Sequence, residues 1–182
     1  TDVEYADNFG FVIKLICTAE ALENGKIAAN VRPTLVSREN ILSGVNGVFN
    51  CIMINGDQTG EVAFYGKGAG KEATASAVVA DIMDCIKHIP ARKYLYWEDG
   101  DETFVDTDYD NNGKLYVLIK AEDFVSVLTQ FQNLFPDCKQ VIKNEFTKEI
   151  AFITEPDYES VIKNKLSQFT DIKSIKTLKT LA

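Results

Sequence analysis

The sequence predicts an α+β protein built from two consecutive parts. In the first part, two apolar runs flank an Asn-Gly turn and lead through a glycine-rich turn into a long amphipathic helix. In the second part, the apolar pattern follows the order strand, helix, strand, strand, helix, strand, which is the order of a ferredoxin-like βαββαβ module. We expect residues 1–91 to form a mixed sheet with helices on one face, and residues 92–182 to form the ferredoxin-like module.

Composition excludes several classes of function. The 182-residue chain has a formal net charge of −8, without a cluster of Lys and Arg, which argues against nucleic-acid partners because their binding depends on neutralising phosphates. There is no apolar run as long as a membrane span and no visible signal peptide, so we expect no membrane partner and a cytoplasmic location. The widely spaced cysteines in apolar patterns predict reduced, buried thiols rather than disulfides or a zinc site; they are Cys17, Cys51, Cys85 and Cys138.

The chain begins with Thr1, which is not a natural start, so we expect it to be part of a longer protein. Thr1 or Asp2 can cap a first helix, whose predicted apolar positions are Tyr5, Phe9, Val12, Ile13 and Ile16. A strand is predicted over Lys26–Val36, and Pro33 places its second half at a sheet edge or in a bend.

The next segment predicts a hairpin followed by a helix. The runs Val48–Ile54 and Glu61–Tyr65 are joined by Asn55-Gly56-Asp57, a strong hairpin signal. After the glycine turn, apolar residues recur with the spacing of one helical face, at Ala75, Val78, Val79, Ile82, Ile86 and Ile89. This helix should end near His88, before Pro90. As the single histidine, His88 is expected to cap the helix rather than to act as a catalyst.

The turn Gly66-Lys67-Gly68-Ala69-Gly70 is the candidate functional element. Its glycines allow positive φ and the close approach of another group, and the free amides of the following helix can bind a phosphate or a nicotinamide amide. A purely structural connection is the competing interpretation. A dinucleotide-binding GxGxxG is excluded by Lys71, and a P-loop is excluded by Tyr65 and Glu72.

An acidic stretch, Glu98–Asn112, precedes the second part. Asp106, Asp108 and Asp110 have the alternate spacing of a calcium loop, but Asn111 replaces the required glycine and Val117 the required glutamate. We therefore expect a solvated, mobile connection.

The predicted elements of the second part follow from apolar periodicity and turn residues. Phe124, Leu128, Phe131 and Phe135 share one face of its first helix, which Pro136 ends, and Thr154-Glu155-Pro156-Asp157 begins the second helix. The apolar face of that second helix comprises Tyr158, Val161, Ile162 and Leu166. The strands are predicted over Leu115–Ile119, Gln140–Asn144, Glu149–Ile153 and Ile172–Leu178.

The segment SGVNGVFNCIMINGDQTGEVAFYGKGAGKEATASAVVADI resembles the C-terminal part of the catalytic domain of homoserine dehydrogenase. In that family a VNGVFN segment leads through an EGD-type turn to a FYGxGAGxxPTASAVVxDI block, here Val45–Asn50, Asn55-Gly56-Asp57 and Phe64–Ile82. YADNFGFVIKL and VRPTLVS match the preceding elements, so the resemblance covers about residues 1–90. One departure is Ala73, where most members have proline.

The resemblance implies a C-terminal fragment of an enzyme that interconverts L-aspartate 4-semialdehyde and L-homoserine with NAD(P)H, in threonine and methionine biosynthesis. The last glycine of the GxGAG motif contacts the cofactor in that family, which implies cofactor-binding roles for Gly70 and then Gly68. The family's Rossmann half and catalytic lysine precede Thr1, so we expect in this chain no catalytic residue, no metal site, no bound cofactor and no activity. We expect a homodimer.

The position of the βαββαβ module after such a core resembles an ACT-type domain. The effector loop of ACT domains carries an acidic-x-Pro-Gly motif, whereas this junction reads Lys120-Ala121-Glu122-Asp123-Phe124. This departure predicts that the module does not bind an amino-acid effector there. The alternative hypothesis for the whole chain is a stand-alone, non-catalytic module for small-molecule binding or oligomerisation.

Overall fold

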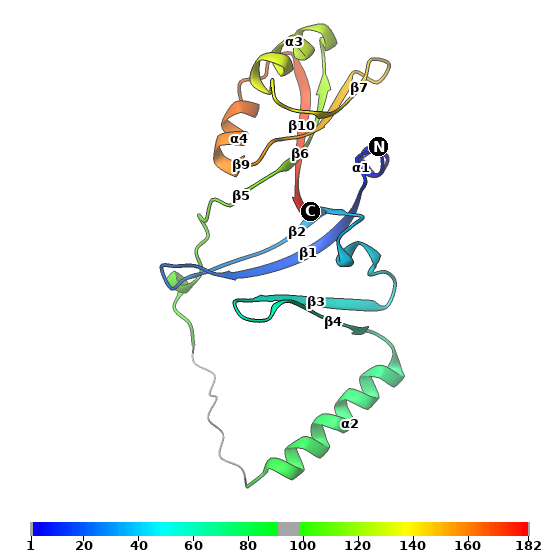
Figure 1. Cartoon of the computed structure of the whole chain (residues 1–182), viewed down its shortest axis with the longest axis vertical. Helices are drawn as coiled ribbons and strands as arrows, with labels where there is room; N and C mark the ends of the chain where they lie inside the picture. Colours follow the sequence, from blue (N-terminus) through cyan, green and yellow to red (C-terminus); the bar gives the residue numbers. More distant parts are fainter. Residues whose placement is uncertain (1, 91–98, 182) are drawn as a thin grey trace. The chain divides into compact units, whose positions relative to one another are not determined.

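The computed structural model describes residues 2–90 and 99–181, so the predicted boundary at residues 91–92 lies outside the described residues (Figure 1). The chain divides into two compact units. The first combines Thr1–Ser43 with Asp101–Ala182, and the second is Gly44–Gly100. The N-terminal residues therefore belong to the same unit as the C-terminal module.

A six-stranded mixed sheet forms the first unit, in the order β1-β2-β10-β6-β8-β7. β1 (Phe11–Ala21) pairs antiparallel with β2 (Ile27–Ser37) along its whole length. β2 pairs in parallel with the end of β10 (Ile172–Leu181), through Thr34, Leu35 and Val36. This parallel pair makes the sheet mixed. It joins the β1–β2 hairpin of the N-terminal part to the last strand of the chain.

The C-terminal module has the predicted order of strands and helices. β6 (Leu115–Ala121), α3 (Phe124–Leu134), β7 (Gln140–Asn144), β8 (Glu149–Ile153), α4 (Glu159–Leu166) and β10 follow one another. Their strands lie in the order β10-β6-β8-β7 with antiparallel neighbours. A two-residue strand, β9 (Asp157–Tyr158), pairs with β5 (Asn112–Gly113). α4 therefore begins at Glu159, after the predicted helix start Thr154-Glu155-Pro156-Asp157 rather than within it.

The sheet of the first unit is covered on both faces, because successive side chains of a strand point to opposite sides. α3 and α4 cover one face, where the buried residues include Val117, Ile119, Phe131, Ile150, Phe152 and Ile162. α1 (Asp2–Asn8) covers the other face, where Tyr5 and Ala6 pack with Leu35, Tyr116, Leu118 and Ala151 (Figure 1). The expectation of helices on one face is therefore wrong for this sheet.

The predicted N-terminal helix is much shorter than its apolar periodicity suggests. α1 ends at Asn8, and Gly10, with a φ of 82°, turns the chain into β1. Val12, Ile13 and Ile16, predicted on a helical face, lie in the strand instead. β-branched residues favour strands, and eleven paired positions with β2 outweigh the helical spacing.

The first part does not build a sheet of its own from β1 and β2, since both belong to the C-terminal sheet. The expectation for Pro33 is also wrong. The second half of β2, after Pro33, lies between β1 and β10, and Leu35 and Val36 are fully buried there. The first half of β2, before Pro33, pairs with β1 on one side, and among the described residues no second strand pairs with it. Pro33, which lacks an N–H, stands just before the pairing with β10 begins.

The second unit contains the predicted hairpin and helix. β3 (Phe49–Gly56) and β4 (Gly60–Lys67) pair antiparallel from Phe49↔Lys67 to Gly56↔Gly60. α2 (Lys71–His88) ends at the predicted residue. Every residue of α2 is exposed or half-buried, including its predicted apolar face.

Residues 101–112 of the acidic stretch belong to the first unit and form hydrogen bonds within it, whereas the sequence predicted a mobile connection. After the short helix η2 (Glu102–Phe104), Val105 forms a parallel bridge with Ile27, and the Asp106 amide donates to the Ile27 carbonyl at 2.9 Å. The Asp110 carboxylate accepts hydrogen bonds from the amide and the hydroxyl of Ser160, at the start of α4. The stretch therefore connects β2 to α4.

All four cysteines are free, but the prediction that they are buried is wrong, because none of them is fully buried. Cys17 and Cys85 are exposed, while Cys51 and Cys138 are half-buried. Among the described residues, no helix is both long and apolar enough to cross a lipid bilayer.

Candidate functional site

The glycine turn lies between β4 and α2, as predicted. The Gly68 amide donates to the Val48 carbonyl at 2.9 Å, which ties the turn to the residue just before β3. The Thr74 amide donates to the Gly70 carbonyl at 3.0 Å, which closes the first turn of α2. The hairpin and the helix therefore fix the turn at both ends.

Gly70 needs to be glycine because of its backbone conformation. Its φ is 120° and its ψ is 140°, a combination that side chains disfavour. A β-carbon built on Gly70 meets no described atom within 4 Å. The space beside Gly70 is thus open, as the approach of a ligand to the backbone requires.

A side chain at position 68 would displace the side chain of Asn50. A β-carbon on Gly68 would lie 1.7 Å from Asn50 Nδ2 and 2.4 Å from its Cγ. Asn50 is the cross-strand partner of Gly66, and its carboxamide extends diagonally to Gly68. The structure therefore brings Gly68 together with Asn50, a residue that sequence reasoning missed. The hairpin register was the signal that could have found it.

The start of α2 adds backbone donors to this turn. Gly70 occupies the N-cap position, and no side chain of the described residues caps the helix. The amides of the first helical turn have no partner within a helix, and the helix dipole makes this end positive. Together with the open space at Gly70, the turn can receive an anionic or polar group of a ligand.

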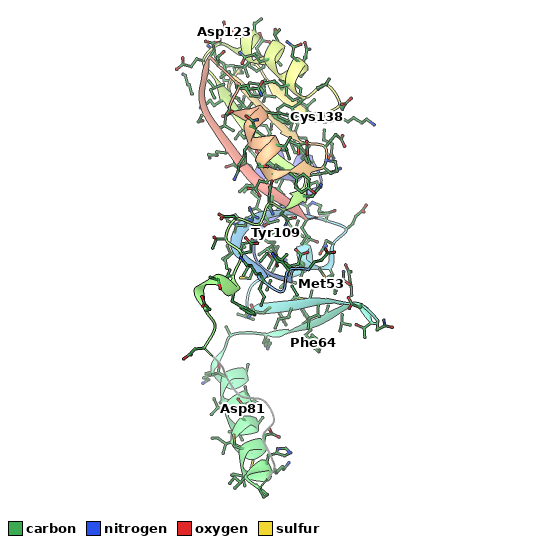
Figure 2. The ribbon with its side chains drawn as sticks, turned by 90° about the vertical axis from the view of Figure 1, so that its left-hand side faces the viewer. Met53, Phe64, Asp81, Tyr109, Asp123 and Cys138 are labelled. Atoms are coloured by element: carbon green, nitrogen blue, oxygen red, sulfur yellow. The ribbon has the colours of Figure 1, made fainter. Side chains whose placement is uncertain are left out.

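An apolar surface adjoins the turn on the hairpin. Ile52 pairs with Phe64 and Ile54 with Val62, on the same face as Asn50, and these four side chains are between 37% and 64% exposed. Phe64 is labelled on β4 in Figure 2. On α2, Val78, Val79, Ile82, Met83 and Ile86 are also about half exposed or more. Apolar surfaces of this kind mark contact sites.

The predicted effector junction of the C-terminal module is occupied by its own side chains. Asp123, labelled in Figure 2, caps α3 by accepting hydrogen bonds from the Val125 and Ser126 amides, at 3.0 and 3.2 Å. Asp171 accepts a hydrogen bond from the Ser126 hydroxyl at 2.8 Å, and its carbonyl accepts one from the Glu122 amide at 2.7 Å. Phe124 packs against the core, as predicted.

A charged cluster links β2, α4 and β10. Glu159 lies 3.2 Å from Arg32, 2.9 Å from Lys163 and 3.6 Å from Lys179, measured between carboxylate oxygens and side-chain nitrogens. Burial by itself raises the pKa of Glu159, but the hydrogen bond from Lys163 and the nearby positive charges lower this pKa overall. Beside the cluster is an open cavity of about 470 Å³, lined by β2, the acidic stretch and α4. Its mixed charges do not favour one class of ligand.

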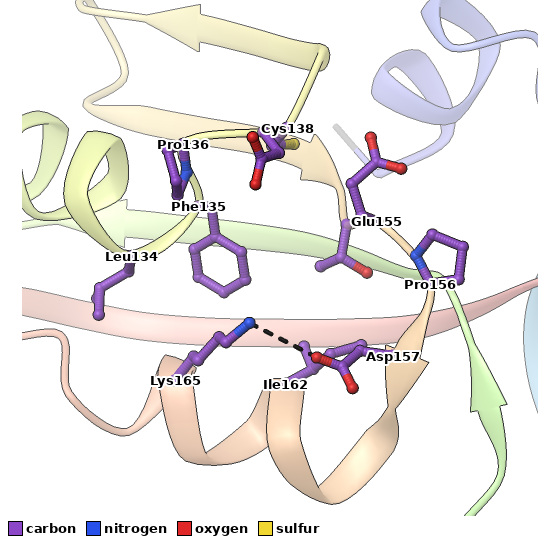
Figure 3. Close-up of a pocket in the computed structure, with 11 residues that line it drawn as sticks. Leu134, Phe135, Pro136, Cys138, Glu155, Pro156, Asp157, Ile162 and Lys165 are labelled. Carbon is purple, nitrogen blue, oxygen red and sulfur yellow. Dashed lines mark ion pairs between the residues drawn. The ribbon is translucent and has the colours of Figure 1, made fainter.

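A smaller cavity of about 80 Å³ lies between the end of α3 and the start of α4 (Figure 3). Lys165 and Asp157 form an ion pair there at 3.6 Å. Burial, together with the charge of Glu155, raises the pKa of the Cys138 thiol to about 11. The thiol donates a hydrogen bond to the Ile153 carbonyl at 2.9 Å, so Cys138 is a poor nucleophile at neutral pH.

His88 behaves as a helix-end residue. Its Nδ1 lies 3.0 Å from the Asp84 carbonyl, and the ring is exposed. Within the part of the chain that the structure describes, no three His, Cys, Asp or Glu side chains are grouped as a metal ion would require. The glycine turn is the site that both the sequence and the geometry favour.

Comparison with known proteins assigns the family. A family profile described as homoserine dehydrogenase matches residues 1–83. The homoserine dehydrogenase of Pseudomonas aeruginosa is 45% identical over 86 residues, which cover 47% of this chain and 20% of that protein. The homoserine dehydrogenase of Lactococcus lactis is 31% identical over 193 aligned residues, which cover 100% of this chain and 45% of that protein.

The fold agrees with this assignment. The crystal structure of a homoserine dehydrogenase from Thiobacillus denitrificans superimposes with a TM-score of 0.81 and 25% identity, over 99% of this chain and 44% of that one. The chain thus spans less than half the length of the curated relatives and solved structures that it matches throughout. The chain belongs to the homoserine dehydrogenase family.

Proposed function

We propose that this chain is the C-terminal part of a homoserine dehydrogenase and supplies one wall of the NAD(P) site through the turn at Gly68 and Gly70. The observation that carries this proposal is the geometry of Gly70. It combines a glycine-only conformation, open space beside the backbone and the uncapped start of α2, inside the segment that the family profile matches.

The residues of the turn fit a nicotinamide nucleotide, which offers phosphate, ribose and carboxamide oxygens. The amides at the start of α2 can donate to such oxygens, and Gly70 allows the ligand to approach its backbone. The chain's own contribution is to bind and orient the cofactor.

A bound NAD(P)+ would supply the hydride acceptor for the oxidation of the hydroxyl-bearing carbon of L-homoserine to the aldehyde of L-aspartate 4-semialdehyde. A base must accept the hydroxyl proton. We expect that base in the part of the matched relatives that lies outside the region aligned with this chain. The reaction would serve threonine and methionine biosynthesis in the cytoplasm.

The C-terminal module is proposed to be an ACT-type domain that packs or dimerises without an effector. Its strand order and its two helices on one face support the architecture. The engagement of Asp123 and Asp171 with their own neighbours supports the absence of an effector, because these two carboxylates already accept hydrogen bonds within the module.

A non-catalytic oligomerisation module is the second candidate. The exposed apolar faces of the hairpin and of α2 favour it. The same faces also suit a homodimeric enzyme, so they do not decide between the two functions.

The experiment compares the product of the complete gene with the 182-residue chain. Homoserine-dependent reduction of NAD(P)+ is expected from the complete product and not from the chain alone. Turnover by the purified 182-residue chain would contradict the proposal, because it would show that the chain contains a complete active site. A complete product without turnover would favour the oligomerisation module.

A further inference from the structure

The side chain of Asn50 lies directly against the glycine turn, at Gly68. Its carboxamide occupies the position that a β-carbon of Gly68 would need. Asn50 is exposed, and its carboxamide makes no hydrogen bond to the residues that the structure describes. A group of this kind, with donor and acceptor capacity beside a ligand-binding turn, is available to a ligand.

At Gly68, the absence of a side chain leaves room for this contact. Unlike Gly70, Gly68 does not have a positive φ, so an L side chain could adopt its backbone conformation. Glycine at position 68 therefore makes room for the Asn50 carboxamide.

The hairpin register keeps Asn50 in place. Asn50 pairs with Gly66, and Gly68 is bonded to the carbonyl of Val48, two residues before Asn50. The strand that carries the carboxamide and the turn that carries the backbone amides are thus fixed to one another. Exposed apolar side chains, Ile52 and Phe64, follow Asn50 on the same face.

We propose that Asn50 is a cofactor-binding residue, whose carboxamide hydrogen-bonds the NAD(P) ligand next to the backbone of Gly70, and that Gly68 serves by making room for it. This inference rests on the proposed function of the turn. It adds a side chain to a site otherwise made of backbone groups, and it makes the effects of positions 50 and 68 interdependent.

The test uses the product of the complete gene and measures the KM for NAD(P)+, kcat, the KM for homoserine and the melting temperature. Asn50→Ala should raise the cofactor KM about fivefold, the size expected for one lost hydrogen bond, with kcat and the homoserine KM unchanged. Gly68→Ala should have a similar effect, because its methyl group displaces the carboxamide. The double variant should be no worse than either single one.

Two further variants separate binding from folding. Asn50→Asp keeps the shape but replaces the donor with a negative charge, so it should raise the cofactor KM more than Asn50→Ala does. Asn55→Ala, on the same strand at the other end of the hairpin, is the matched control and should change nothing.

The outcomes distinguish this inference from the function on which it rests. If the wild-type protein did not oxidise homoserine, both the proposed function and the role of Asn50 would be refuted. Active wild-type protein, with an unchanged cofactor KM in Asn50→Ala and Asn50→Asp, would overturn the role of Asn50 alone. Effects of Asn50→Ala and Gly68→Ala that multiply in the double variant would show that the two positions act independently, which also contradicts the proposal.

Discussion

The hydroxyl of Tyr5 donates a hydrogen bond of 2.9 Å to Oε2 of Glu149, across 144 positions of the sequence. Glu149 is only 7% exposed, and Thr147 donates to the same oxygen at 2.9 Å. Lys120 lies 3.8 Å from the other carboxylate oxygen. A buried carboxylate needs such donors, so this contact fixes α1 on the sheet of the C-terminal module.

Tyr5→Phe should therefore lower the free energy of unfolding of the chain by about 1–3 kcal/mol, since Glu149 loses a donor in a buried position. Chemical denaturation followed by circular dichroism measures this. Tyr158→Phe is the matched control, because Tyr158 is 52% exposed. Equal stabilities of the two variants would show that the contact does not hold α1 in place.

Glu159 predicts an acid-dependent loss of stability. Its folded-state pKa is depressed below the ordinary 4.5, so the stability it contributes is present above that value and is lost as the pH falls through the folded-state pKa. Glu159→Gln should lower the melting temperature at about pH 7, and the difference from wild type should shrink towards about pH 3. Glu155→Gln, in an exposed loop, serves as the control. A difference independent of pH would contradict the charged cluster.

Gly70→Val should raise the cofactor KM of the complete gene product strongly, because the backbone beside the ligand can no longer keep a φ of 120°. The strain should also cost about 1–3 kcal/mol of stability. Gly66→Ala is the control, since Gly66 lies in β4 just before the turn, with an ordinary φ and open space. A lower melting temperature with unchanged cofactor KM would mean that the turn is purely structural.

The apolar hairpin face predicts self-association of the chain. Ile52, Ile54, Val62 and Phe64 would be buried between two copies in a homodimer. Light scattering at tens of micromolar should give twice the monomer mass of 20.3 kDa, and Phe64→Asp should restore the monomer. Phe146→Asp, at a position that is 98% exposed on another turn, should remain dimeric. A monomeric wild-type chain would refute this prediction.

The C-terminal module should not bind threonine tightly. Glu122 and Asp123 would repel the carboxylate of the amino acid, and Asp123 is already engaged in capping α3. Calorimetry with threonine, methionine, lysine and isoleucine should give a Kd weaker than about 1 mM for threonine. A tighter Kd would overturn this interpretation of the junction, and binding of lysine alone would indicate a cationic effector.

Local signals in the sequence were enough to predict much of the fold. The Asn-Gly pair between apolar runs predicted the hairpin of β3 and β4, although Asn55 and Gly56 end β3 and the turn itself is residues 57–59. The periodicity after Gly70 predicted α2, and turn residues placed β7 and β8 at their observed bounds. Gly70 and Gly68 were also selected from the sequence, because the glycine turn is visible in it and resembles the GxGAG motif of the family.

The sequence by itself determined the glycine turn, the hairpin, the long helix and the strand–helix order of the C-terminal module, since each depends on residues close together in the chain. The tertiary structure alone decided that Val12, Ile13 and Ile16 lie in a strand, that β2 joins β10, and that Tyr5 reaches Glu149. It also placed Asn50 against Gly68. These features depend on contacts between segments that are distant in the sequence. The free energy gained from those contacts outweighs local secondary-structure propensity, and no periodic pattern in the sequence indicates them.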